Sequence, residues 1–431
     1  MNELQSQRYP RFTVIIPQKD RAEYLVHTLR TCMLQDYPNF EIIVSDDGST
    51  DGSVAMVREL MRVDSRIKLF AHERHIGMRE NFEFALRQVA PGYVIALGGD
   101  DGLVPGCISR MHEILSTTKR ELLTWPLAGF TYPEQPGGEN IVYIERRKDR
   151  GVRFIKSREF LSTIARTFRY QVSECPMFYM KGVASTELID RVKSRTSDGS
   201  FYVCPTPDGF SGIVLAGEVE DFAFTDEPLS IGGTTIKSQG IKYQKTDGDA
   251  RQVAERFFAD NVGRAMHREL ASQPYSPLAT LMSADYLLTA RDLPGWPGQF
   301  PPLSYEALLQ ESFNLMEKSS FENAVLVREL EILKAIAVQH GLLDRFNDLL
   351  QRSRRRVVRK PPVYGFVITS LVRFEGRRLG IKNLHDAALI IPFLYRLYNV
   401  AGLRSGLELV RNIIRVLLRN RSFTVERYPN V

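Results

Sequence analysis

The sequence predicts an α/β protein, in which a mostly parallel sheet flanked by helices precedes a mainly α-helical C-terminal region. Two observations predict this class. Over the first hundred residues, short apolar runs alternate with segments at helical spacing, which is typical of parallel sheets. The apolar runs are continuous rather than alternating with polar residues, which indicates that both faces of the sheet are covered.

Each element of the first part follows from the spacing of its apolar residues. FTVIIP (12–17) is a buried strand, and Pro17 ends it. The next segment (22–35) brings Leu25 and Leu29 to one face of a helix. The other predicted strands are EIIVSDD (41–47), IKLFAHE (67–73) and GYVIALGGDD (92–101), and the other predicted helices are SVAMVRELMRV (53–63) and GMRENFEFALRQV (77–89).

The pattern changes after residue 102. Strand-like and helical pieces are mixed up to about 240, and helical periodicity then dominates to 351. The apolar stretch 386–403 is expected to form core or a buried helical hairpin. We expect three parts, which are an α/β domain over 1–240, a helical domain over 241–351 and a basic, partly amphipathic helical tail over 352–431.

The composition is that of a soluble globular protein, with 43% hydrophobic and 25% charged residues in a chain of 431. The first ten residues lack the apolar region of a secretory signal. No stretch of about 20 residues is both apolar and uncharged, so we expect no spanning helix. The four cysteines lack CxxC spacing and fit buried thiols in a reducing compartment. We therefore expect a cytoplasmic protein.

Positive charge is concentrated at the C-terminal end. The net charge is +6, of which residues 352–431 carry +13, so the rest of the chain carries −7. Within 407–420, Arg411, Arg415 and Arg419 fall on one helical face opposite apolar residues. This suits an anionic membrane surface and a peripheral position at the inner face of the cell membrane. A helix packed on the protein is the open alternative, and we expect no nucleic-acid partner, because no recognised binding fold accompanies the basic residues.

Two acidic pairs follow two of the predicted strands. Asp46 and Asp47 come after the second strand, and Asp100 and Asp101 after the fourth. Because ligands bind beyond the carboxyl ends of parallel strands, the two pairs can converge on one cleft. Neighbouring carboxylates need a compensating charge, and a divalent cation such as Mg²⁺, which also binds substrate phosphates, supplies one. Turn and helix-cap roles are the alternative for each pair.

The order of four segments carries a resemblance to a known family. The chain contains FTVIIPQKDRAEYL, EIIVSDDGSTDGS, HIGMRENFEFAL and YVIALGGDDGLVPG in succession. This set resembles the signature segments of family-2 glycosyltransferases, over residues 11–106 and more weakly to about 240. The resemblance implies the GT-A fold, a Rossmann-like sheet, and a nucleotide-diphosphate sugar as donor, with a UDP-sugar favoured.

The resemblance places the nucleotide along the first two strand ends and the start of the third predicted helix. The segment of Pro17 and Lys19 borders the nucleotide in that family. The positions of Asp46 and Asp47 form the nucleoside site, although Asp47 is equally explained as a turn residue, and Asp51 is expected to cap a helix. A basic group after the third strand often faces the diphosphate. His75 or Arg79 would serve here, unless both are solvated.

The resemblance also implies a metal site and a general base. The family's metal motif is commonly Asp-x-Asp-Asp, and here Gly98-Gly99-Asp100-Asp101 lacks the first acid. Asp101 is expected to bind Mg²⁺ or Mn²⁺ through the donor diphosphate, with Asp100 close to the ribose or the metal. PTPDGFSG (205–212) resembles a segment of surface-polysaccharide enzymes, which makes Asp208 the expected base.

A turn acid is the alternative for Asp208, and Asp221 and Glu218 are the next candidates for the base. The expected function is that of an inverting, metal-dependent glycosyltransferase. It would move a sugar to a glycan or lipid-linked saccharide acceptor in polysaccharide biosynthesis. A nucleotidyltransferase would carry a Gly-rich triphosphate loop after the first strand, which PQKDRAEYL does not provide. A non-catalytic sugar-nucleotide-binding or scaffold protein of the same fold stays open.

Overall fold

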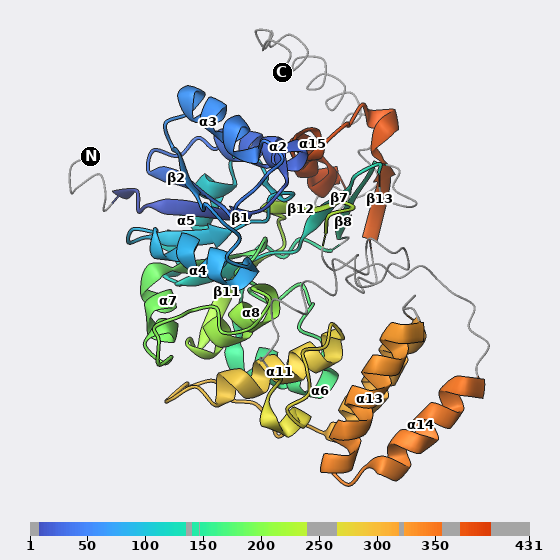
Figure 1. The fold of residues 1–431 in the computed structure, drawn as a ribbon. Helices are drawn as coiled ribbons and strands as arrows, with labels where there is room; N and C mark the ends of the chain where they lie inside the picture. The colour runs from blue at the N-terminus through green and yellow to red at the C-terminus, as the bar shows by residue number, and fades with distance from the viewer. Residues whose placement is uncertain are drawn as a thin grey trace.

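The computed structural model describes residues 8–134, 140–145, 147–238, 265–318, 323–355 and 371–397 (Figure 1). It is an α/β structure with a large mixed sheet, which confirms the predicted fold class. Among the helices of these residues, none combines the length and the apolar character that crossing a membrane requires. All four cysteines, Cys32, Cys107, Cys175 and Cys204, are buried free thiols, as predicted.

The large sheet has eight strands among the described residues, in the order β3-β2-β1-β4-β10-β6-β11-β9. β1 is parallel to β2 and β4, and β2 is parallel to β3. The chain passes outward from β1 to β3 and returns on the other side of β1 at β4, so the switch point where such sheets bind ligands lies between β1 and β4. The strands are β1 (Phe12–Gln18), β2 (Phe40–Asp46), β3 (Ile67–Ala71), β4 (Tyr93–Ala96), β10 (Gly182–Ser185), β6 (Leu122–Thr124), β11 (Asp221–Thr225) and β9 (Val152–Lys156).

Successive residues of the central strands pack on opposite faces of the sheet, because side chains alternate along a strand. Val14 of β1 lies in one buried cluster with Leu25 and Leu29 of the following helix. Ile15 lies in a second buried cluster with Phe82. The helices of this half of the chain are α2 (Ala22–Met33), α3 (Ser53–Val63), α4 (Met78–Arg87) and α5 (Cys107–Thr118), the first three within two residues of their predicted bounds.

A second sheet joins segments that lie far apart in the sequence. Its order is β13-β8-β7-β12-β5. β5 follows the second acidic pair directly and pairs with β12, and β13 is added antiparallel to β8 from the predicted tail. The strands are β5 (Gly102–Leu103), β7 (Ala128–Thr131), β8 (Ile141–Glu145), β12 (Ser230–Thr234) and β13 (Leu371–Glu375).

Helices dominate the described residues after 265, as the spacing predicted. α11 packs against α8 and α6 under the large sheet, and a separate buried cluster joins α11 to α12, α13 and α14 (Figure 1). The helices are α6 (Ser157–Thr167), α7 (Thr186–Lys193), α8 (Asp208–Gly217), α11 (Ala279–Arg291), α12 (Tyr305–Lys318), α13 (Asn323–Gln339) and α14 (Leu343–Arg355), with a 3₁₀ turn η1 (Arg268–Leu270).

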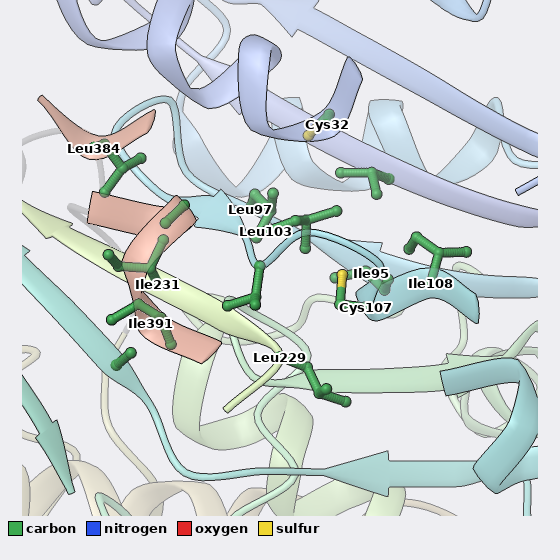
Figure 2. Close-up of a cluster of buried hydrophobic side chains, with 14 of the residues drawn as sticks. Cys32, Ile95, Leu97, Leu103, Cys107, Ile108, Leu229, Ile231, Leu384 and Ile391 are labelled. Carbon is green, nitrogen blue, oxygen red and sulfur yellow. The ribbon is translucent and has the colours of Figure 1, made fainter. Parts of the chain in front are cut away.

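The described part of the predicted tail returns to the first part of the chain. After β13 and the turn η2 (Gly376–Leu379), α15 (Leu384–Tyr395) lies beside α2. Leu384 and Ile391 are fully buried and contribute to the same cluster as Leu97, Leu103 and Ile231 (Figure 2). The apolar stretch is therefore buried over the helix, as predicted. The three-part division of the chain stays a prediction, and 407–420 lies outside the described residues.

Candidate active site

The first acidic pair begins at the carboxyl end of β2, beside the end of β1. The Asp46 carboxylate accepts hydrogen bonds from the side-chain amide of Gln18 and, at 2.8 Å, from the Ser49 backbone N–H. Gln18 is buried, and its Oε1 has no hydrogen-bond partner among the described residues. A carboxylate can accept further hydrogen bonds on its remaining lone pairs. Asp46 and Gln18 therefore leave both acceptor capacity and a buried amide oxygen at the switch point.

Asp47 holds a loop rather than standing alone. Its carboxylate accepts from the backbone N–H of Ile76 at 2.6 Å and of Gly77 at 3.2 Å, and lies 2.6 Å from Nδ1 of His75. The Asp47 side chain is 4% exposed, whereas the His75 side chain is 40% exposed. Asp47 thus fixes the loop that presents the His75 ring toward solvent near the first acidic pair.

The loops after β1 and β2 are tied together by a third carboxylate. Asp51 accepts from the Ala22 backbone N–H at 2.9 Å and from the Ser53 backbone N–H at 3.1 Å. These are the first N–H groups of α2 and α3, which have no partner inside their helices. Asp51 is therefore a helix-capping residue, as expected.

Asp100 lies in the tight turn after β4 and faces the loop after β1. Its Oδ2 pairs with Arg21 at 2.7 Å and accepts from the hydroxyls of Thr235 at 3.1 Å and Ser238 at 3.2 Å. No hydrogen bond to its Oδ1 is present among the described residues. One oxygen of Asp100 is thus committed to the protein, and the other is left for a ligand.

Asp101 is buried and held by backbone groups. Its Oδ2 accepts from the Gly98 N–H at 2.8 Å and its Oδ1 from the Gly233 N–H at 3.0 Å. Burial, followed by the neighbouring charge of Asp100, raises the pKa of the Asp101 carboxyl from 3.8 to about 7. Two carboxylates held this close in a buried place favour a compensating positive charge.

The space beside Gly98 tests whether a metal-bound diphosphate fits here. A Cβ placed on Gly98 would stand 2.7 Å from Oδ2 of Asp101, 2.7 Å from the hydroxyl oxygen of Tyr179 and 3.2 Å from Oδ1 of Asp100. Three oxygens therefore converge on one point. No cluster of three or more His, Cys, Asp or Glu side chains occurs within the described ranges. Two carboxylates with room for substrate oxygens fit Mg²⁺, which usually takes one or two carboxylates plus phosphates.

Asp208 is the first residue of α8 and is partly buried, with its Oδ1 shielded from solvent. Its Oδ1 has no hydrogen-bond partner among the described residues. Burial raises the pKa of the Asp208 carboxyl above its ordinary 3.8. Tyr179 lies within electrostatic range of Asp208 as well as of both acids after β4. The predicted base and the acids after β4 are thus both near this tyrosine.

The two other acids considered for the base are occupied by ion pairs. Asp221 pairs with Arg120 at 2.5 Å and with Lys156 at 3.2 Å. Glu218 accepts hydrogen bonds from two guanidinium nitrogens of Arg195, Nε and, at 2.9 Å, Nη2. A carboxylate held in this way is a poor proton acceptor, which leaves Asp208 as the stronger candidate.

Three other predicted site residues, Pro17, Lys19 and Arg79, form no contact with either acidic pair that compares with those above. Pro17 is buried within β1. Lys19 is half-buried just beyond that strand and forms no ion pair with a described residue. Arg79 donates to the Tyr202 carbonyl at 3.4 Å and pairs with Glu80, and neither contact involves an acidic pair. The structure thus groups Lys19 with the switch point and leaves Arg79 on the outer side of α4.

Sequence reasoning missed the side chains that hold the acids. Arg21 stands in the segment after β1 that the motif marked, so its charge beside an acidic pair was a usable signal. Tyr179 and Thr235 are 78 and 134 residues beyond Asp101. No short-range pattern could connect them. The missed residues are Gln18, Arg21, Tyr179 and Thr235.

The first part of the chain is similar in sequence to known proteins. Residues 13–159, about a third of the chain, match the model of Glycosyl transferase family 2. A Campylobacter jejuni relative, described as a GalNAc(5)-diNAcBac-PP-undecaprenol beta-1,3-glucosyltransferase, is 34% identical over 105 residues, 24% of this chain and 34% of the relative. TuaG of Bacillus subtilis, provisionally assigned to teichuronic acid biosynthesis, is 30% identical over 92 residues, 21% of this chain and 36% of the relative. The chain thus spans about a third of the length of these relatives.

Solved structures also resemble the chain. Residues 1–349 of TarS from S. aureus, in complex with UDP-GlcNAc, align over 80% of this chain and 92% of TarS 1–349, with 13% identity and a TM-score of 0.46. The mannosyltransferase PcManGT from Pyrobaculum calidifontis, in complex with GDP-Man and Mn²⁺, aligns over 80% of this chain and 88% of its own, with 14% identity and a TM-score of 0.40.

Proposed function

Residues 13–159 form a family-2 glycosyltransferase domain, and from this premise we propose that the protein transfers a sugar from a nucleotide-diphosphate donor to a glycan or lipid-linked acceptor in polysaccharide biosynthesis. One observation carries the proposal. The acids after β2 and β4 flank the switch point, and Tyr179 lies within electrostatic range of both Asp208 and the acids after β4. A UDP-sugar is the favoured donor.

The nucleoside would lie against the ends of β1 and β2. Asp46 keeps acceptor capacity for base or ribose groups, and Oε1 of Gln18 is a further buried acceptor for an N–H of the base. Lys19 lies just beyond β1 and forms no ion pair with a described residue. His75, placed by Asp47, is the proposed basic group on the diphosphate side. Arg79 is the weaker candidate for that role.

Asp101 and Asp100 are the residues that would hold Mg²⁺ or Mn²⁺, through Asp101 and the free Oδ1 of Asp100. When bound, such a cation would neutralise charge that develops on the leaving diphosphate. The chain itself supplies the backbone donors of Gly98 and Gly233, which orient Asp101. Arg21 fixes Asp100 through Oδ2, whereas Oδ1 is the oxygen that faces Gly98.

Asp208 is the proposed general base of an inverting transfer. The acceptor hydroxyl oxygen forms the new bond to the anomeric carbon, the bond from that carbon to the diphosphate oxygen breaks, and the hydroxyl proton moves to the Asp208 carboxylate. A raised pKa brings a carboxylate closer to the operating pH, which favours proton transfer. The buried Oδ1 has no competing hydrogen bond among the described residues.

The test is release of the nucleotide from a panel of UDP- and GDP-sugars by the purified chain, with and without Mn²⁺. We expect turnover that falls by about 10²–10⁴-fold in Asp208→Asn, the range for loss of a general base. Asp101→Asn should weaken dependence on Mn²⁺ together with turnover. Asp348→Asn, an exposed acid of α14, is the matched control and should leave turnover unchanged. An absence of both binding and turnover with every donor would favour the non-catalytic scaffold.

A further inference from the structure

Tyr179 lies beside the acidic turn after β4, on a turn that the sheet holds in place. The turn precedes β10, and the Met180 N–H donates to the Ala96 carbonyl at the end of β4 at 2.8 Å. Met180 has a positive φ of 66°, a conformation that a side chain other than glycine rarely adopts. The Tyr179 ring packs edge-on against Phe82, with centroids 6.0 Å apart. Backbone and ring contacts together fix where the hydroxyl lies.

The hydroxyl occupies the space that a side chain at position 98 would take. The oxygen lies 2.7 Å from the point where a Cβ on Gly98 would stand, closer than real Cβ atoms approach other atoms. Position 98 is where the acidic motif lacks its first acid. A side chain at position 98 would therefore meet both the Asp101 carboxylate and the Tyr179 hydroxyl, so a phenol from a distant segment lies close to the place of the first acid of the motif.

The phenol has unused hydrogen-bonding capacity. No hydrogen bond of the Tyr179 hydroxyl to another described residue is present, and the residue is only partly buried. Phenols are protonated at neutral pH and can donate an O–H. A carboxylate at position 98 would only accept. The exchange of acid for phenol thus turns an anionic acceptor into a neutral donor between the acids of the β4 turn and Asp208.

We propose that Tyr179 is a donor-positioning residue, whose hydroxyl replaces the absent first acid and donates a hydrogen bond to an oxygen of the transferred sugar. This inference rests on the proposed function. The hydroxyl lies beside Asp101 on one side and within range of Asp208 on the other. The transferred sugar must lie between the diphosphate and the base, so it is the part of the donor that this hydroxyl reaches.

Tyr179→Phe tests the inference because it removes one oxygen and keeps the ring against Phe82. With Mn²⁺ present, calorimetric titration compares the UDP-sugar that the unaltered chain binds best with UDP alone. We expect the UDP-sugar to bind roughly five- to tenfold more weakly to the variant, the range for one lost hydrogen bond, and UDP to bind equally well. A merely structural role would weaken both ligands equally.

Tyr93→Phe is the matched control. Tyr93 lies at the start of β4, whereas Tyr179 lies near the end of that strand. The Tyr93 ring stacks on Phe12, and no hydrogen bond of its hydroxyl is present among the described residues. Tyr93→Phe should bind the UDP-sugar and UDP as tightly as the unaltered chain does. Equal affinity of Tyr179→Phe for the UDP-sugar, or equal loss for UDP, would overturn the inference. Failure of the unaltered chain to bind any nucleotide sugar would instead overturn the proposed function, and the inference with it.

A double-mutant cycle tests the shared space directly. Gly98→Ala should weaken UDP-sugar binding, since the added Cβ meets the Tyr179 hydroxyl and Asp101. In the Tyr179→Phe background the hydroxyl is absent, so the same change should cost less. Groups in contact show such non-additivity, whereas independent groups add. Additive losses in the two backgrounds would show that position 98 and the Tyr179 hydroxyl do not share one space.

Discussion

At the scale of single residues, the site is built from carboxylates whose partners differ. Asp51 and Asp47 accept hydrogen bonds from backbone N–H groups and so fix loops. Asp100 is half committed, through Arg21, and Asp208 keeps an oxygen without a described partner. Buried carboxylates without full compensation cost stability and are typical of functional sites. The unsatisfied acids are therefore the ones to which we assign chemistry.

The state of Asp208 predicts a conflict between activity and stability. Burial raises the pKa of its carboxyl above 3.8, so the free energy of unfolding is highest when the group is protonated and falls as pH rises through the raised pKa. Asp208→Asn cannot ionise, so it should melt at a higher temperature than the unaltered chain at pH 8.

The difference in melting temperature between Asp208→Asn and the unaltered chain should shrink as the pH is lowered from 8 toward the ordinary carboxyl pKa of 3.8. Thermal unfolding followed by circular dichroism across this range measures it, and the exposed Asp348→Asn should show no such trend. A variant that is less stable than the unaltered chain at every pH would contradict the assignment of an uncompensated buried carboxyl.

At the scale of elements, sequence patterns predicted the strands and helices whose positions depend on residues close together in the chain. Continuous apolar runs identified β1 to β4, and apolar spacing identified α2 to α4, because burial on both faces of a parallel sheet leaves a direct mark on the sequence. The acids at the ends of β2 and β4 could be located in the same way. The antiparallel β10 and the pairing of β13 with β8 could not, since both depend on contacts between segments far apart in the chain.

The returning helix α15 gives a prediction at this scale. Leu384 is fully buried, and its Cδ2 lies 3.1 Å from the point where a Cβ on Gly102 would stand, directly after the acidic turn (Figure 2). Leu384→Ala should lower the free energy of unfolding by about 3 kcal/mol, the usual cost of removing a buried leucine side chain. Urea denaturation of the full chain measures the change.

Leu343→Ala is the matched control for Leu384. Leu343 begins α14 and is 38% exposed, so its truncation should change the free energy of unfolding by less than about 0.5 kcal/mol. Because α15 supports β5 and the turn before it, Leu384→Ala should also weaken binding of the nucleotide sugar. Unchanged stability in Leu384→Ala would mean that α15 does not support the sheet in solution.

At the scale of the whole molecule, the end of the described chain returns to the first part of the protein. The strands that carry the two acidic pairs come first, the helical region follows, and the chain then returns with β13 in the second sheet and α15 beside α2 (Figure 1). The residues from 352 onward carry +13 against −7 elsewhere. A strongly basic segment attached to a mildly acidic body is suited to hold that body against an anionic surface. For a transferase that acts on a lipid-linked acceptor, such docking would bring the active site to its substrate.

The amphipathic segment 407–420 is the part of the tail that we expect to dock, as a proposal from its sequence. Replacing Arg411, Arg415 and Arg419 by glutamine removes about 3 kcal/mol of attraction, at about 1 kcal/mol for each arginine at an anionic surface. Co-flotation with phosphatidylserine-containing vesicles should then fall about a hundredfold, and added salt should weaken the unaltered chain in the same way. A variant with Arg62, Arg158 and Arg166, which are exposed elsewhere, changed to glutamine keeps the total charge equal and should still float. Equal flotation of both variants would instead favour a helix that packs on the protein.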